Sequence, residues 1–223
     1  MNRAFVWLGG ALFMLSLAFC AYSYLIVWGR PADVDVRAIP IDAALFGVFA
    51  AHHSVLARER AKAAVAQLVS DRLARPTYVW IASLLLIAVC AAWRPVGGEL
   101  YRATGWRAAM HAGVQLAGLG IIAVSVRAID PLELAGIRIP AAAEPLQIGG
   151  PYRYVRHPLY LGWLLATFGA AHMTGDRAAF AAISAIYLLS AVPLEERSLV
   201  RHFGGAYREY RRRVRWRVVP YVY

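Results

Sequence analysis

The segment Gly149–Gly162, GGPYRYVRHPLYLG, concentrates groups that could bind a charged ligand. Hydrogen-bond donors and aromatic faces come from Tyr152, Arg153, Tyr154, Arg156, His157 and Tyr160. Pro158 suits the first turn of a following helix, because the N–H that it lacks would have no partner there. The free N–H groups of such a helix start favour a carboxylate or another anion. The alternative is an aromatic and basic belt that anchors a helix at the membrane surface.

Two adjacent carboxylates, Glu195 and Glu196, form the second group with chemical potential. In one continuous helix, offsets of three and four residues place Glu196 on a face with largely aromatic side chains. That face comprises Leu199, Phe203, Tyr207 and Tyr210. Adjacent acids at a membrane boundary are costly unless solvated or paired, so a cationic ligand is a natural partner. The alternative is a solvated helix end whose acids are neutralised by Arg197 and Arg201.

His52 and His53 interrupt an apolar run. A neutral imidazole can accept a thiol proton or orient a nucleophile near neutral pH, so each is a candidate general base. The alternative is a pair of histidines that hydrogen-bond between helices. No metal site is expected, because His, Cys and acidic residues do not recur at ligand spacing. Cys20 and Cys90 lie in apolar runs and are expected to pack as small buried side chains.

Long apolar runs must position these groups. Hydrophobic residues make up 60% of the 223 residues and charged residues 17%, which excludes an ordinary soluble domain. A membrane crossing takes about 20 apolar residues. Six runs are candidate spans: Phe5–Trp28, Ile39–Leu56, Tyr78–Trp93, Trp106–Ile129, Leu159–Met173 and Ala178–Leu194. The last two predict a hairpin with two short arms.

We therefore predict an all-α fold, a polytopic membrane helical bundle that forms a single domain over residues 1–223. Residues 1–76 supply the first two spans, residues 77–148 the central spans, and residues 149–223 the candidate binding core. Gly118 and Gly120 fall in a match to a dinucleotide-binding pattern, but no strand precedes them. Close helix packing explains these glycines better.

The distribution of charge predicts the orientation. Six spans with both termini in the cytoplasm place 18 of the 24 Lys and Arg residues on the cytoplasmic side, as the positive-inside rule requires. We expect an integral protein of a bacterial inner membrane, with the tail and the loop at 58–76 in the cytoplasm. Orientation and contact with anionic lipids then account for the net charge of +11, and no nucleic-acid partner is expected.

The two chemical segments occur in a familiar order. GPYRYVRHPLYLG is followed by a hydrophobic hairpin, then by EERSLVRHFGGAYREYRRRV and a proline. The order RHPxYxG, hairpin, Glu-Glu pair and GxxYxxY resembles the isoprenylcysteine carboxyl methyltransferase and phospholipid methyltransferase superfamily of membrane enzymes. The resemblance covers residues 149–220.

This resemblance implies that S-adenosylmethionine binds between the hairpin and a C-terminal tail helix, in a pocket open to the cytoplasm. Carried over position by position, the implied cofactor-binding residues are Tyr152, Arg156, His157, Tyr160, Gly162, Glu195, Glu196, Tyr207 and Tyr210. The chemistry agrees, because the ammonium and sulfonium of this cofactor attract carboxylates and aromatic faces. Its carboxylate favours arginine or helix N–H donors.

A weaker likeness upstream concerns the acceptor. AHHSVLAR at 51–58, RPTYVWIASLLL at 75–86 and WRP at 93–95 are similar to the branch that includes methanethiol S-methyltransferases. The expected acceptor is small or lipid-soluble, foremost a thiol such as methanethiol, with His52 and His53 as the catalytic candidates. A prenylcysteine carboxylate or a phospholipid headgroup is the alternative acceptor.

Two other classes of function stay open at this point. The ending VRWRVVPYVY also resembles the tails of NADPH-dependent membrane sterol reductases, although the Glu195 and Glu196 pair favours a methyltransferase. A non-enzymatic membrane scaffold could use the basic tail to bind anionic lipid. That reading leaves the motif at 149–162 unexplained.

Overall fold

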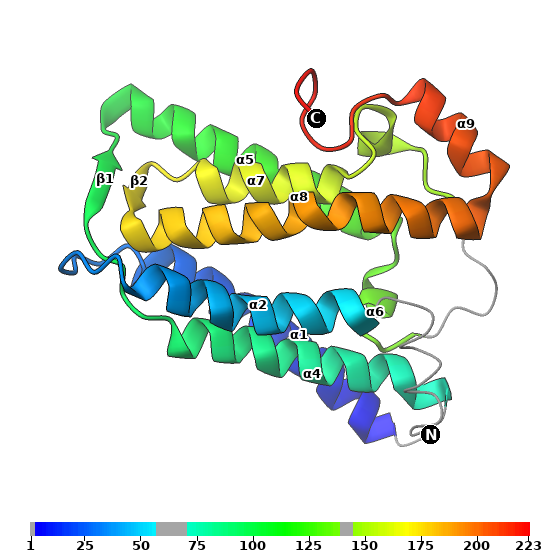
Figure 1. Cartoon of the computed structure of the whole chain (residues 1–223), viewed down its shortest axis with the longest axis horizontal. Helices are drawn as coiled ribbons and strands as arrows, with labels where there is room; N and C mark the ends of the chain where they lie inside the picture. Colours follow the sequence, from blue (N-terminus) through cyan, green and yellow to red (C-terminus); the bar gives the residue numbers. More distant parts are fainter. Residues whose placement is uncertain (1–2, 57–70, 139–144) are drawn as a thin grey trace. The chain divides into compact units, whose positions relative to one another are not determined.

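Helices dominate the computed structural model, which describes residues 3–56, 71–138 and 145–223. In chain order they are α1 (Arg3–Tyr22), the π-helix η1 (Ser23–Val27), α2 (Ala38–Leu56), α4 (Asp71–Ala92), α5 (Gly105–Ala128), α6 (Pro131–Leu134), the 3₁₀-helix η2 (Gly150–Arg153), α7 (Pro158–Phe168), α8 (Gly175–Phe203) and α9 (Gly205–Arg213) (Figure 1). Two short strands, β1 (Glu99–Arg102) and β2 (His172–Thr174), pair with each other. The predicted all-α fold is confirmed.

Four helical segments of the described chain are long and apolar enough to cross a membrane. They are Arg3–Val27, Leu73–Ala92, Gly105–Ala128 and Gly175–Phe203. The run predicted as the second span forms α2, which is not among these four, and α7 is a shorter apolar helix. Large apolar side chains such as Leu15 and Leu116 are exposed on these helices, as expected where lipid covers them. The chain is therefore an integral membrane protein.

The predicted hairpin differs from the observed one in its second arm. α7 is short, with 11 residues, but α8 is one helix of 29 residues that continues through Pro193. α8 then ends before Gly204, whose φ of +56° is a conformation that favours glycine. α9 starts after this break. The expectation of a single helix from Glu196 to Tyr210 is therefore wrong.

The chain divides into two compact units. The first unit, residues 1–98, 131–142 and 174–179, holds α1, η1, α2, α4, α6 and the start of α8. The second unit, residues 99–130, 143–173 and 180–223, holds β1, α5, η2, α7, α9 and most of α8. The single domain expected from the sequence stays a prediction. Most of the predicted cytoplasmic loop at 58–76 lies outside the described residues.

The first unit is organised around α4, which packs against both α1 and α2. Trp80 of α4 stacks on Phe5 and donates a hydrogen bond to the Phe5 carbonyl oxygen at 3.0 Å. The buried carboxylate of Asp176 accepts three hydrogen bonds, from the Trp93 side chain and from the backbone N–H groups of residues 96 and 97. Cys20 and Cys90 are free and buried, as predicted.

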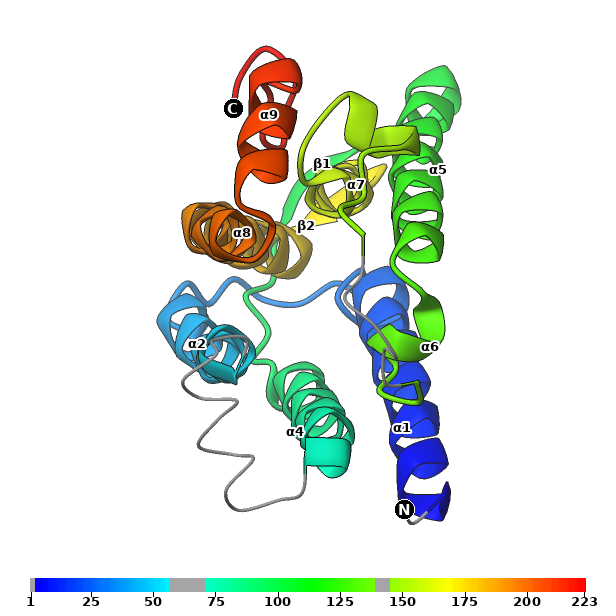
Figure 2. The same cartoon turned by 90° about the vertical axis from the view of Figure 1, so that its right-hand side faces the viewer.

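In the second unit α7 lies between α5 and α8 (Figure 2). A Cβ atom added to Gly118 of α5 would come within 2.6 Å of the Gly162 carbonyl oxygen on α7, so the helix backbones approach closely there. On the other side of α7, Trp163 donates a hydrogen bond to Ser184 of α8 at 3.0 Å. The packing interpretation is confirmed for Gly118 but is wrong for Gly120, because no atom lies within 4 Å of a Cβ added there.

Candidate functional site

The start of α7 is joined to α8 and to the tail by Arg156. Its Nε donates to the carboxylate of Glu196 at 2.5 Å, and its Nη1 donates to the carbonyl oxygens of Val214 and Arg215. The guanidinium is almost fully buried. A buried charge is tolerated when it is paired and hydrogen-bonded in this way.

The tail returns to this segment through its backbone. The N–H of Arg156 donates to the Trp216 carbonyl, and the N–H of His157 donates to the Arg217 carbonyl. The RHP sequence is thus held by main-chain bonds before α7 begins. Pro158 occupies the first turn of α7, as predicted.

The adjacent acids have different surroundings. The Glu196 side chain is 4% exposed and lies within 4 Å of Arg156, Arg211 and Arg217. By contrast, the Glu195 side chain is 42% exposed. The charge of Glu196 is therefore paired with arginines inside the protein, and Glu195 is the carboxylate that a ligand can reach.

His157 and Tyr160 sit beside Glu195. Their rings stack with centroids 5.4 Å apart, and the Tyr160 hydroxyl donates to the Glu195 carboxylate at 2.7 Å. His157 Nδ1 lies 3.6 Å from the same carboxylate. The result is a carboxylate beside a stacked pair of aromatic rings, whose polar edges point at it, a combination suited to an organic cation.

Two polar atoms in this region lack a hydrogen-bond partner among the described residues. They are the buried hydroxyl of Tyr207 and the buried Nε2 of His157, which lies 3.6 Å from a carboxylate oxygen of Glu196. Buried polar atoms are normally satisfied, so exceptions of this kind call for an explanation such as a ligand.

The tyrosines of α9 face inward despite the break at Gly204. Tyr207 and Tyr210 are buried with Val214, and Tyr210 donates a hydrogen bond to the Tyr152 carbonyl at 2.7 Å. Burial raises the pKa of Tyr207 and of Tyr210 above the usual range of a phenol. Burial and the charge of Glu195 raise the pKa of Tyr152 to about 12. All three phenols are therefore neutral donors at physiological pH.

Gly162 has a packing role in the structure. Its own added Cβ atom would lie 2.7 Å from the Gly118 carbonyl oxygen, so it faces α5. The sequence also missed two participants, Arg211 and Arg217, which reach Glu196 from the tail. The cluster of arginines in the tail is evident in the sequence, but no local pattern indicates which of them contact Glu196.

The candidate general bases lie in the first unit. His53 Nδ1 is 2.6 Å from the hydroxyl of Tyr78, and the His52 ring stacks on the Tyr78 ring at 5.3 Å. Both ring nitrogens of His52 are buried without a hydrogen-bond partner among the described residues. Tyr78 stands in the RPTYVW stretch, but no local pattern pairs it with the histidines.

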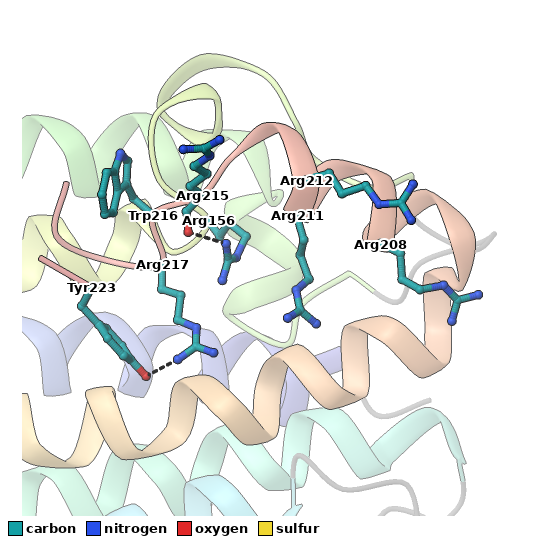
Figure 3. A pocket seen from close by; sticks show the side chains of 8 residues that line it. All are labelled: Arg156, Arg208, Arg211, Arg212, Arg215, Trp216, Arg217 and Tyr223. Carbon is teal, nitrogen blue, oxygen red and sulfur yellow. Dashed lines mark hydrogen bonds between the residues drawn. The ribbon is translucent and has the colours of Figure 1, made fainter. Parts of the chain in front are cut away.

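Among the described residues no three His, Cys, Asp or Glu side chains are grouped as metal ligands would be. The second unit also contains a cavity of about 610 Å³ at the tail, lined mainly by arginines (Figure 3).

Fold and site together define an integral membrane protein with a buried ion-pair cluster where a helical hairpin meets its tail. The family model described as phospholipid methyltransferase matches residues 109–206 of this chain. This range contains α7, α8 and the acidic pair.

Curated relatives match over a larger part of the chain. Methanethiol S-methyltransferase of Crocosphaera subtropica is 34% identical over 246 aligned residues, covering 100% of this chain and 94% of the relative. Methanethiol S-methyltransferase of Mycobacterium tuberculosis is 34% identical, and the match covers 80% of this chain and 77% of the relative. Methanethiol S-methyltransferase 1 of Bradyrhizobium diazoefficiens is 36% identical, covering 80% of this chain and 66% of the relative, slightly under two thirds. No solved structure matches.

The chain belongs to the family of integral membrane methyltransferases that contains these relatives. It is accordingly an enzyme, and the sterol reductase and scaffold alternatives lose their support.

Proposed function

We propose that the protein transfers a methyl group from S-adenosylmethionine to a small thiol such as methanethiol. The acceptor is suggested by the names of the relatives, which are methanethiol S-methyltransferases and cover up to 100% of the chain. The cofactor is suggested by the half-exposed Glu195 carboxylate beside the stacked rings of His157 and Tyr160. This arrangement of charge is the observation that carries the proposal.

The residues present fit the cofactor. When bound, it supplies a methyl group on a positively charged sulfur. Glu195 would attract the ammonium, while Tyr160 and His157 would offer aromatic faces to the positive sulfur. The unsatisfied His157 Nε2 and Tyr207 hydroxyl would gain partners. Arg156 and Glu196 would position this region, with Tyr152, Tyr210 and Gly162 supporting it by packing.

The histidine cluster would handle the proton of the acceptor. A small thiol is mostly protonated at neutral pH, since even the more acidic cysteine thiol has a pKa of about 8.5, so it needs a base. For His53 to accept that proton at Nε2, its Nδ1 must carry a hydrogen and donate it to the Tyr78 oxygen. In this proposal the imidazole of His53 would take up the S–H proton, and the cofactor, when bound, would supply the methyl group that the thiol sulfur accepts.

A phospholipid headgroup is the second candidate acceptor, because the matching family model carries the description phospholipid methyltransferase. A headgroup amine would also have to lose a proton. The thiol is favoured because the relatives named methanethiol S-methyltransferase match much more of the chain than residues 109–206.

We further propose that both termini face the cytoplasm, where the cofactor is available. The tail segment after α8 contains six arginines, which favours this side of an inner membrane. A cysteine introduced at Arg212 should resist an impermeant thiol reagent in intact cells and react after lysis. Labelling before lysis would reverse the orientation.

Calorimetry on purified protein tests the cofactor. S-Adenosylmethionine and its demethylated product should bind, and NADPH should not. Glu195→Gln should weaken binding about tenfold, a typical effect of losing one hydrogen bond to a charged group. Glu209→Gln, a change at an exposed acid of α9, is the matched control and should bind normally. Binding of NADPH alone would contradict the proposal.

A further inference from the structure

The cavity at the tail is lined by more positive charge than the proposed cofactor needs. Its volume is about 610 Å³. Six arginines, one tryptophan and one tyrosine line it: Arg156, Arg208, Arg211, Arg212, Arg215, Arg217, Trp216 and Tyr223 (Figure 3). No carboxylate is among the lining side chains of this cavity.

The arginines fall into two groups. Arg156, Arg211 and Arg217 lie within 4 Å of the buried Glu196 carboxylate, which neutralises one positive charge among the three. Arg208 and Arg215 are exposed and form no ion pair with any described residue. Arg212 has only a loose contact with Glu209, at 3.7 Å. The cavity therefore keeps an excess of positive charge.

This charge selects the class of ligand. S-Adenosylmethionine carries a sulfonium and an ammonium, so clustered guanidinium groups would repel most of it. A phosphate is the opposite case, because guanidinium groups bind its oxygens through paired N–H donors. The ligand of the cavity is thus an anion, most suitably one that carries a phosphate.

The neighbourhood of the cavity points to lipid as the source of that phosphate. The cavity adjoins α9, which follows the membrane-spanning helix α8 after the turn at Gly204. The rings of Trp216 and Tyr221 are tilted against each other with centroids 5.2 Å apart, and Tyr221 and Val222 are 86% and 79% exposed. Exposed aromatic and apolar residues beside clustered arginines are typical of a membrane interface.

We propose that this cavity binds the phosphate headgroup of an anionic phospholipid, with Arg208 and Arg215 as the arginines free to contact it. Arg211 and Arg217 would connect the bound headgroup to Glu196. An anionic lipid would in this way brace the tail against the region that holds the acidic pair.

Native mass spectrometry of the full chain in detergent tests this inference. Phosphatidylglycerol should bind in preference to phosphatidylcholine with the same acyl chains. Arg208→Gln combined with Arg215→Gln should reduce that preference at least tenfold, because a basic residue near an anionic surface contributes about 1 kcal/mol, or roughly fivefold. The control combines Arg37→Gln with Arg107→Gln, two exposed arginines distant in sequence from the tail, and should keep the preference.

Other outcomes would overturn the proposal. Equal binding of the two lipids by the parent protein would exclude an anionic lipid site. Equal losses in the tail and control variants would indicate general charge attraction only. Inorganic phosphate in millimolar amounts should not displace phosphatidylglycerol, and full displacement would show that a soluble anion is the ligand. Because methyl transfer is not measured here, failure of this inference is separate from failure of the proposed activity.

Discussion

Nε of Arg156 lies 2.5 Å from a carboxylate oxygen of Glu196, although 40 residues separate the two along the chain. Arg156 belongs to the RHP segment before α7, and Glu196 belongs to the acidic pair of α8. The buried ion pair explains why these two motifs occur together in the sequence. The RHP segment supplies the cation, Arg156, that allows the carboxylate of Glu196 to be buried. The neighbouring acid, Glu195, stays partly exposed.

Glu196→Gln should unfold the region around Arg156. Removing one partner of a buried ion pair leaves the other charge uncompensated and typically costs about 3–5 kcal/mol. Thermal denaturation in detergent should show a large fall in the midpoint temperature. Replacing both partners, as Arg156→Met with Glu196→Leu, should recover part of the loss.

Glu195→Gln provides the contrast. Its side chain is 42% exposed, so the stability should change by less than about 1 kcal/mol while cofactor affinity falls. Equal destabilisation by the two glutamine substitutions would contradict the distinct roles given to these acids.

Gly118→Ala should separate α5 from α7. The new methyl group would lie 2.6 Å from backbone atoms of Gly162 and Ala166, which cannot move independently of α7. We expect destabilisation of about 1–3 kcal/mol, the usual cost of overpacking. Gly120→Ala is the matched control on α5, because no atom lies within 4 Å of its added Cβ. A similar loss in the control would indicate that helix packing is not the cause.

Tyr78→Phe should impair activation of the acceptor. It removes the hydroxyl that lies 2.6 Å from His53 Nδ1 and keeps the ring that stacks on His52. At neutral pH the rate of thiol methylation should fall about tenfold or more, part of the contribution of a general base. Cofactor affinity should stay unchanged.

The pH profile separates this role from a structural one. As the pH rises toward the pKa of the acceptor thiol, thiolate becomes available and the Tyr78→Phe rate should recover. Tyr101→Phe, which removes a hydroxyl hydrogen bond to Ala170 instead, should show no such recovery and little initial loss. A loss for Tyr78→Phe that is the same at every pH would refute a role in proton transfer.

The pairing of β1 with β2 should weaken in acid. Glu99 accepts hydrogen bonds from Arg102 and His172 at 2.8 Å, and chiefly the bond from Arg102 lowers the pKa of this carboxyl below its ordinary range. A lowered pKa stabilises the fold above the unfolded value and loses that effect as the pH falls through the folded value. Hydrogen exchange at residues 99–102, corrected for its intrinsic rate, should therefore accelerate in acid. In Glu99→Gln the pH dependence should disappear.

Hydropathy predicted the helices well because membrane crossing imposes a simple demand on length and composition. Side-chain spacing predicted the structure wrongly at the position where a single backbone angle ends a helix. The positive φ of Gly204 ends α8 inside a sequence whose spacing suggested a continuous helix to Tyr210. The inward position of Tyr207 and Tyr210 was expected, but the chain achieves it by turning.

The different roles of Glu195 and Glu196 could not be predicted from the sequence, for another reason. Neighbouring residues on a helix point about 100° apart, so one acid of a pair must differ from the other in its surroundings. Which acid is buried depends on Arg211 and Arg217, which arrive from the tail through non-local contacts. The same limit applies to Tyr78 and His53, which are 25 residues apart.

Methyl transfer from labelled S-adenosylmethionine tests the central claim most directly. The purified parent protein is incubated with methanethiol and other small thiols, with a prenylcysteine and with phosphatidylethanolamine, and the labelled product is identified. We expect label in the methylated small thiol, with Glu195→Gln requiring more cofactor for the same rate and Glu209→Gln behaving as the parent. Label only in the prenylcysteine or the phospholipid, with none in any thiol, would contradict it.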